Sequence, residues 1–194
     1  MAYLDLLCSQ LSTVPQHELG YLDQEHFPNL PKLAEKPVSE AVSAVRAYLQ
    51  SINDLRDRLE RAAQIFSCLA VMNAVQPWAL YHVERMRNQR DIVTGIMKKM
   101  WHRRVFGTYV KTTVSVCCSC VIVPTEERSR DYKPYFFVIW HSQPCIAIYE
   151  APEGQSTLLK NALAQVLGSQ PESFRCGVYQ SLSSAYVAAR QFFQ

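Results

Sequence analysis

The chain of 194 residues is 48% hydrophobic, which is enough to bury a core and excludes a wholly disordered protein. No stretch approaches the roughly 18 apolar residues of a membrane span, and the start MAYLDLLCSQL lacks the basic residues of a signal peptide, so we expect no membrane contact. The net charge of +3 is unevenly spread, with −4 over residues 1–60, +7 over 61–133 and 0 over 134–194. A basic middle segment is typical of proteins that bind a polyanion.

Residues 1–76 have the pattern of short helices separated by prolines and one glycine. The first helix is expected over about residues 2–12. A later one begins after Pro37 and has apolar residues at spacings of three and four, namely Val38, Ala41, Val42, Val45, Tyr48 and Leu49. A further helix is expected from about Asn53 to Met72. Several short helices in this length predict a compact bundle, of the death-fold type.

A longer helix is predicted after Pro77, from Trp78 to Arg104. Its apolar positions, such as Leu80, Ile92 and Met100, leave a set of basic side chains for solvent or a partner: Arg85, Arg87, Arg90, Lys98, Lys99, Arg103 and Arg104.

The pattern then changes to that of β-structure. Apolar and polar residues alternate from Val110 to Cys120, which predicts one half-buried strand. The segment TEERSRDYKP predicts a polar turn, and YFFVIWH and CIAIYE predict two more strands. Two closing helices each have one apolar stripe, formed by Leu158, Leu159, Ala162, Leu163 and Val166 in the first and by Tyr179, Leu182, Tyr186, Ala189 and Phe193 in the second.

The expected fold class is therefore α+β, with two domains. Residues 1–76 are predicted to form a helical bundle. Residues 77–194 are predicted to form the basic helix and a small α/β domain, whose three-stranded antiparallel sheet is covered by helices.

The motif CCSC at residues 117–120 is the strongest metal-site pattern in the chain. On a strand, however, Cys118 and Cys120 point to one face and Cys117 to the other, and no second Cys or His pair lies at ligand spacing. The sequence also lacks a GxSxG elbow, an HExxH motif and a glycine-rich phosphate loop. The seven cysteines are an odd number scattered through apolar segments, so we expect reduced thiols. The missing motifs predict no metal, no cofactor and no enzyme. The rival interpretation, a thiol-dependent enzyme, requires a cysteine beside a histidine in an open cleft.

Two basic clusters lie in the middle of the chain. The residues around KKMWHRR can be a solvated helix end, where cations complement the helix dipole. The second cluster, formed by Arg128, Arg130 and Lys133, is interleaved with Tyr132 on a predicted hairpin loop, and loops commonly carry binding residues. Together they predict a surface that contacts phosphate, with one aromatic anchor.

Several motifs, in this order and spacing, resemble the centromere protein N family. The main stretch is DYKPYFFVIWHSQPCIAIYE, with a Tyr-Lys-Pro turn before a strand and a Ser-Gln-x-Pro hairpin after it. GIMKKMWHRRV, LLKNALAQVLG and QSLSSAYVAA resemble the flanking helices, and VPQHEL resembles a break between the first two helices. The resemblance implies a pyrin-like N-terminal domain, an α/β domain shared by centromere proteins N and L, and a location at the centromere in the nucleus.

By this resemblance, the chain would be a non-enzymatic kinetochore adaptor. It would recognise the centromeric nucleosome through the L1 loop of the variant histone H3 and the adjacent DNA. Matching positions imply that Arg128, Tyr132, Lys133 and Arg175 face the nucleosome or its DNA, that Lys36 lies near a basic pair, and that Asp5 faces a histone arginine.

The sequence also differs from the family. Cys8, Ser9 and Thr13 stand where the family has basic residues, so the resemblance does not carry the DNA contacts of that helix over. Family members are longer, and their later part pairs with centromere protein L, so either this chain is a fragment or that partnership, with other inner-kinetochore proteins, is missing. The alternative function is a helical protein-interaction module whose basic surface binds RNA or another protein.

Overall fold

The structure is a computed structural model that describes residues 1–23, 27–83, 89–100, 107–112, 116–125, 131–150, 157–168 and 174–192. The side chains of residues 89, 90, 111, 112 and 116–119 are outside the described part. Within these ranges the chain forms one six-stranded antiparallel sheet and seven helices, one of them a 3-10 helix.

The N-terminal helices begin and end close to where the apolar periodicity places them. They are α1 (Ala2–Leu11), the 3-10 helix η1 (Gln16–Leu22), α2 (Val38–Ser51) and α3 (Leu55–Val71). Proline occupies the N-cap positions of η1 and α2. Asp54 caps α3, because its carboxylate accepts a hydrogen bond from the Asp57 N–H at 2.9 Å.

The sheet has the strand order β2-β3-β4-β5-β1-β6. Its strands are β1 (Trp78–His82), β2 (Gly107–Thr112), β3 (Val116–Pro124), β4 (Tyr132–Trp140), β5 (Cys145–Tyr149) and β6 (Arg175–Tyr179). The longest pairing joins β3 to β4, from Val116 opposite Trp140 to Pro124 opposite Tyr132. β1 lies between β5 and β6, although it precedes both in the chain.

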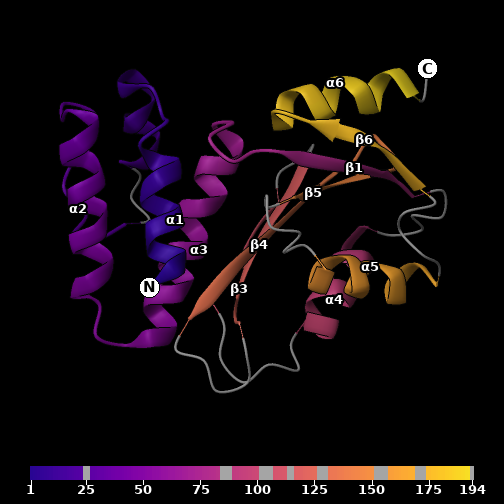
Figure 1. Cartoon of the computed structure of the whole chain (residues 1–194), viewed down its shortest axis with the longest axis horizontal. Helices are drawn as coiled ribbons and strands as arrows, with labels where there is room; N and C mark the ends of the chain where they lie inside the picture. Colours follow the sequence, from indigo (N-terminus) through magenta and orange to yellow (C-terminus); the bar gives the residue numbers. More distant parts are fainter. Residues whose placement is uncertain are drawn as a thin grey trace.

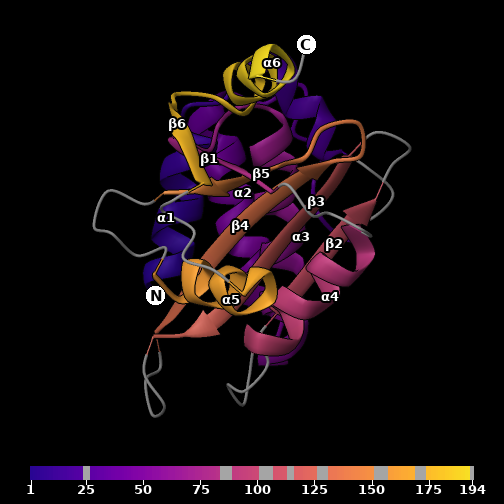
Figure 2. The same ribbon diagram turned by 90° about the vertical axis from the view of Figure 1, so that its right-hand side faces the viewer.

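Helices cover both faces of this sheet (Figure 1). The side chains of α1, α2, α3 and α6 (Leu182–Phe192) pack in one core with one face of the sheet. The opposite face packs against α4 (Gln89–Met100) and α5 (Thr157–Leu167), which lie in front of the strands in Figure 2. The strand β4 contributes to both cores, because Phe136 and Val138 point to the first and Phe137 and Ile139 to the second.

The predicted fold class is wrong in two respects. The sheet has six strands instead of three, and the N-terminal helices do not form a separate pyrin-like bundle. Residues of α1 and α3, such as Tyr3 and Phe66, share a core with Phe136 and Tyr132 of the sheet. The apolar side chains of these helices pack against the sheet as well as against neighbouring helices. Helical periodicity alone does not show which of these elements covers the apolar face of a helix.

Two predicted elements are also wrong. The segment from Trp78 to Arg104 is not one helix, since it contains β1 and then α4. The first residues of this segment, Trp78 to Tyr81, are all fully buried because β1 is an interior strand with a core on each face. The segment from Val110 to Cys120 belongs to two strands, β2 and β3, which pair with Thr112 opposite Cys117.

The strand β2 approaches α3 closely at Gly107. A Cβ atom built on this residue would overlap the Leu59 carbonyl group and lie 2.6 Å from the Glu60 backbone nitrogen. Only glycine lets the two backbones approach this closely. Gly107 therefore fixes how the edge of the sheet contacts the N-terminal helices.

Candidate functional site

The start of β4 is joined to α1 by an aromatic contact. The rings of Tyr3 and Tyr132 meet edge to face, with centroids 6.3 Å apart and an interplanar angle of 87°. Tyr132 is only 8% exposed. The prediction that Tyr132 lies on a loop is therefore wrong, because it is the first residue of β4 and its ring packs in the core. Burial raises the pKa of the Tyr3 phenol, an effect that Arg58 partly offsets.

Lys133 follows Tyr132 on β4 and is half-buried. Side chains alternate along a strand, and Tyr135 packs with the core under α4 and α5, so Lys133 projects to that side of the sheet. Its backbone is opposite Val123 of β3. The structure therefore holds the Lys133 ammonium at the beginning of a well-paired strand, next to the contact between α1 and β4.

Asp5 lies on the exposed side of α1, two residues beyond Tyr3. Its Oδ1 accepts a hydrogen bond from Arg46 Nη2 of α2 at 2.9 Å, and the two side chains are 62% and 39% exposed. The hydrogen bond from Arg46 is the main cause that holds the pKa of the Asp5 carboxyl below its ordinary value. The carboxylate is therefore ionised. Its other oxygen, Oδ2, lies 3.8 Å from the Met1 ammonium, and the remaining lone pairs can accept from a further donor, because a carboxylate has about four acceptor positions.

The other described lysines of the predicted site are on separate elements. Lys36 is half-buried in the turn before α2, and the Asp23 carboxylate orders this turn by accepting hydrogen bonds from the Leu33 and Ala34 N–H groups at 2.5 and 3.0 Å. Lys98 and Lys99 are exposed in the last turn of α4. Four further predicted residues, Arg103, Arg104, Arg128 and Arg130, lie outside the described residues.

Arg175 is engaged in an ion-pair cluster at the start of β6. Its Nη2 donates to Glu150 Oε2 at 2.6 Å, while Lys160 of α5 donates from Nζ to Glu150 Oε1 at 2.8 Å. Burial lowers the pKa of Lys160, but the hydrogen bond to Glu150 and the neighbouring Tyr81 phenol outweigh it, so that the pKa rises to about 12. Both cations are thus held around one carboxylate.

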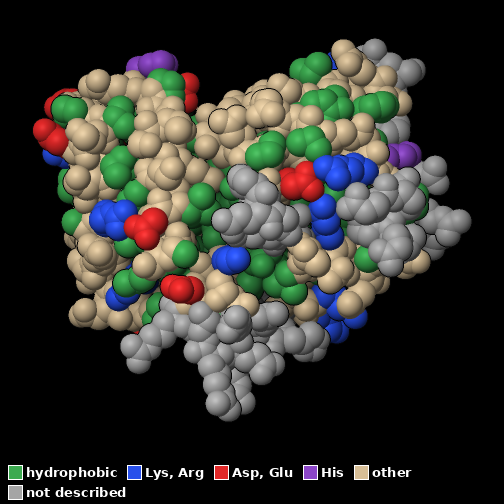
Figure 3. Space-filling model, in the orientation of Figure 1, with side chains coloured by type: hydrophobic (Ala, Val, Ile, Leu, Met, Phe, Trp, Pro, Cys, Tyr) green, Lys and Arg blue, Asp and Glu red, His purple; other side chains and the backbone are tan. Residues whose placement is uncertain are grey.

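The predicted residues do not gather in one place. Lys98, Lys99, Lys133 and the Arg175 cluster belong to the side of the sheet covered by α4 and α5, whereas Asp5 and Lys36 belong to the side of the N-terminal helices. Figure 3 shows one face of the molecule, on which basic and acidic side chains lie next to one another at several places. At the start of β4, Tyr132 points to the face of the sheet that the N-terminal helices cover, and Lys133 points to the face that α4 and α5 cover.

Four of the five cysteines whose side chains are described, all except Cys68, are poor candidates for a nucleophile. Burial raises the pKa of the thiols of Cys8, Cys120 and Cys176, and raises the pKa of Cys145 to about 12. A raised pKa keeps a thiol protonated and unreactive. The side chains of Cys117 and Cys118 lie outside the described part. Among the described residues, no group of three or more His, Cys, Asp and Glu side chains can hold a metal ion.

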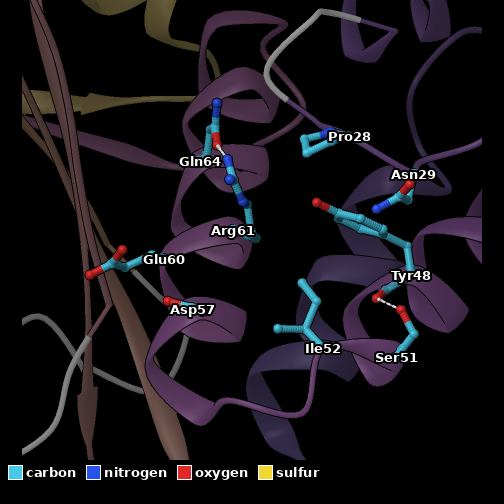
Figure 4. Close-up of a pocket in the computed structure, with 9 residues that line it drawn as sticks. All are labelled: Pro28, Asn29, Tyr48, Ser51, Ile52, Asp57, Glu60, Arg61 and Gln64. Atoms are coloured by element: carbon cyan, nitrogen blue, oxygen red, sulfur yellow. Dashed lines mark hydrogen bonds between the residues drawn. The ribbon is translucent and has the colours of Figure 1, made fainter.

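A polar pocket of about 470 Å³ opens between α2 and α3 (Figure 4). Its nine labelled lining residues include none of the predicted site residues, and they are Pro28, Asn29, Tyr48, Ser51, Ile52, Asp57, Glu60, Arg61 and Gln64. Tyr48 and Arg61 face the pocket from opposite helices, and Arg61 Nη1 donates to Gln64 Oε1 at 3.1 Å. A similar volume, beside η1 and the end of α3, is bordered by Tyr21 and Val71, which are 63% and 56% exposed.

The chain matches no protein-family model and no curated protein sequence. The resemblance to centromere protein N therefore depends on the sequence motifs alone. No helix in the described part of the chain has the length and apolar character needed to cross a membrane.

Sequence reasoning missed the partners of the predicted charges. Arg46 lies 41 positions from Asp5, and Glu150 lies 25 positions from Arg175. Lys160 was predicted only as part of a covering helix. Such partners are set by tertiary packing, and the sequence carries no local signal for them beyond the presence of an opposite charge.

Proposed function

We propose that this chain recognises the centromeric nucleosome, with no enzymatic activity, as an adaptor of the kinetochore in the nucleus. The observation that supports the proposal best is the contact between Tyr3 and Tyr132. It joins α1, which carries the ionised Asp5, to the start of β4, which carries Lys133. The two segments that would offer a carboxylate for a histone arginine and a cation for a DNA phosphate are thus in contact, while the Asp5 and Lys133 side chains lie on different sides of the sheet.

Lys133 and Asp5 would have different roles in such a complex. Lys133, with the exposed Lys98 and Lys99, neutralises phosphate, and the release of counterions makes that part of the affinity fall as salt rises. Asp5 recognises an arginine of the histone loop through a charge-assisted hydrogen bond, which distinguishes one histone from another. Arg46 holds Asp5 ionised and oriented without using all of its lone pairs.

Lys133→Gln is expected to weaken binding to nucleosomes with the variant and with the ordinary histone equally. The side chain keeps most of its length and loses its charge, so one phosphate contact disappears. The slope of log affinity against log salt should become shallower by about one unit. Fluorescence anisotropy with labelled nucleosomes over a salt series measures both quantities. Lys32→Gln, at an exposed lysine outside the proposed surface, is the matched control, and an equal loss in both variants would contradict a specific role for Lys133.

Asp5→Asn is expected to reduce the preference for the variant nucleosome several-fold while leaving the salt slope unchanged, because a carboxylate releases no DNA counterions. Two control variants are measured beside it. Glu40→Gln removes another exposed carboxylate, from the first turn of α2. Arg46→Gln breaks the ion pair but keeps Asp5. The assignment of Asp5 to the histone is wrong if its replacement leaves the preference intact, or if Glu40→Gln reduces the preference as much.

A further inference from the structure

Arg58 of α3 has a guanidinium group that is fixed at the turn between α2 and α3. The side chain is half-buried, and its Nε and Nη2 atoms both donate to the Ile52 carbonyl, at 2.9 and 2.6 Å. Ile52 is the C-cap residue of α2. Carbonyl groups at the end of a helix lack partners within the helix, and basic side chains bind them well. The two hydrogen bonds set the position and orientation of the guanidinium group.

The positive charge of Arg58 has no counterion among the described residues. None of the ion pairs that these residues form includes Arg58, and its hydrogen bonds to Ile52 go to a neutral carbonyl group. Arg56 on the same helix differs in this respect, because its Nε donates to Glu60 Oε1 at 3.1 Å. A cation that is partly removed from water costs free energy unless an anion compensates for the lost hydration. An anion from outside the chain would supply this compensation at Arg58.

The Tyr3 hydroxyl lies beside Arg58 and is also unsatisfied. Tyr3 is 1% exposed, and its buried hydroxyl oxygen forms no hydrogen bond of ordinary geometry with a described residue. The Arg58 charge is close enough to lower the pKa of the Tyr3 phenol, although burial raises this pKa more. Buried polar groups are rarely left without a partner, and both side chains have donors to offer. The contact between α1 and α3 therefore has more donors than acceptors.

Tyr132 links this contact to the start of β4. Its ring meets the Tyr3 ring, and Tyr3 in turn lies beside Arg58. A phosphate group offers several anionic oxygens in a geometry that the fork of a guanidinium group matches. We propose that Arg58 binds a backbone phosphate of DNA beside the contact between α1 and β4. The choice of DNA as the ligand rests on the proposed function, whereas the availability of the charge rests on the contacts of Arg58 itself.

Arg58→Gln tests this contact, and Arg56→Gln is the matched control. Both changes remove one positive charge from the beginning of α3, but Arg56 is paired with Glu60 and is 74% exposed. For Arg58→Gln, binding to a short DNA duplex of arbitrary sequence should weaken about threefold or more, and the slope of log affinity against log salt should become shallower by about one unit. Arg56→Gln should leave both values almost unchanged. Fluorescence anisotropy of the labelled duplex over a salt series gives both values.

Arg58→Lys separates the charge from the hydrogen bonds to Ile52. Lysine keeps a cation at this position but lacks the guanidinium fork, so the variant should be less stable in urea and yet keep the salt slope of the original chain. A role of Arg58 in folding alone predicts the same salt slope for all these variants. The proposal is overturned by folded Arg58→Gln with an unchanged slope, by an equal loss in Arg56→Gln, or by Arg58→Lys that loses as much of the slope as Arg58→Gln.

A second measurement uses the unaltered chain and covers the case in which Arg58→Gln fails to fold. The NMR signal of the Arg58 Nε–H group, assigned by its absence in Arg58→Lys, should shift when the duplex is added, and the Arg56 signal should not. An Arg58 signal that stays in place would contradict the contact. The duplex contains no histone, so a chain without preference between the two kinds of nucleosome would contradict the proposed function while leaving these results unchanged.

Discussion

Tyr132→Ala is expected to lower the free energy of unfolding by about 3–5 kcal/mol, the usual cost of removing a buried aromatic side chain. The Tyr132 ring is 8% exposed and meets the Tyr3 ring edge to face at the junction of α1 and β4. Its loss leaves a cavity between the N-terminal helices and the sheet. Unfolding in urea, followed by circular dichroism, measures the effect.

Tyr132→Phe is the matched control, because it retains the ring and removes only the hydroxyl. We expect it to cost at most about 1 kcal/mol, the net worth of one hydrogen bond. The opposite pattern would be a Tyr132→Ala variant of unchanged stability that binds nucleosomes poorly. That pattern would mean that Tyr132 is an exposed anchor, as the sequence alone predicts, and that the packing of β4 against α1 is described incorrectly.

Gly107→Ala is expected to lower the free energy of unfolding by about 3 kcal/mol, at the upper end of the usual cost of overpacking. The added methyl group would overlap the Leu59 carbonyl group, and backbone atoms cannot turn aside as a flexible side chain can. Relief requires β2 to move away from α3, which separates the edge of the sheet from the core of the N-terminal helices. The midpoint of urea unfolding should fall accordingly.

Gly95→Ala provides the comparison within the same chain. Its added methyl group would lie 3.0 Å from a methyl group of Val166, and Gly95 is inside the helix α4. A side chain can give way, and alanine is favoured over glycine in a helix by about 1 kcal/mol. We therefore expect this variant to be as stable as the original chain or slightly more stable. If both variants lost the same free energy of unfolding, the close approach of β2 to α3 at Gly107 would not be the cause of the loss.

The sequence predicts elements well where one apolar stripe defines a helix. The apolar stripe through Val38, Val45 and Leu49 predicts α2. The apolar stripe of the segment after Asn53 predicts α3. The sequence does not predict which helix or strand packs against each apolar stripe. The period of a helix shows that one face is buried but does not distinguish a neighbouring helix from a sheet. This is why the helices of residues 1–76 were expected to pack on one another.

Each of the missed strands has its own cause. In β1, Trp78 and Leu80 point to one core and Ala79 and Tyr81 to the other, so the strand has no alternation and resembles the beginning of a buried helix. Between β2 and β3, the alternation from Val110 to Cys120 continues through the reversal, with no glycine or proline to mark it. β6 is short, and it is recognised only through its pairing with β1.

The sequence supplies the residue types of the proposed site but not their arrangement. The basic composition of residues 61–133 predicts a polyanion partner, and the motif around Tyr132 and Lys133 resembles one that contacts a nucleosome; both stay predictions. The burial of Tyr132 and the pairing of Asp5 with Arg46 and of Arg175 with Glu150 depend on contacts between distant segments. These contacts decide which charges are available to a partner.

The most direct test of nucleosome recognition compares two particles that differ only in histone H3. The affinity of the unaltered chain is measured for variant and ordinary nucleosomes wrapped in the same DNA, over the same series of salt concentrations. Binding should be several-fold tighter to the variant nucleosome at every salt concentration, with equal salt slopes, because the phosphate contacts are the same and only the histone contact differs. Equal affinity for the two particles would contradict the proposal and leave only a basic surface that binds DNA without regard to the histone.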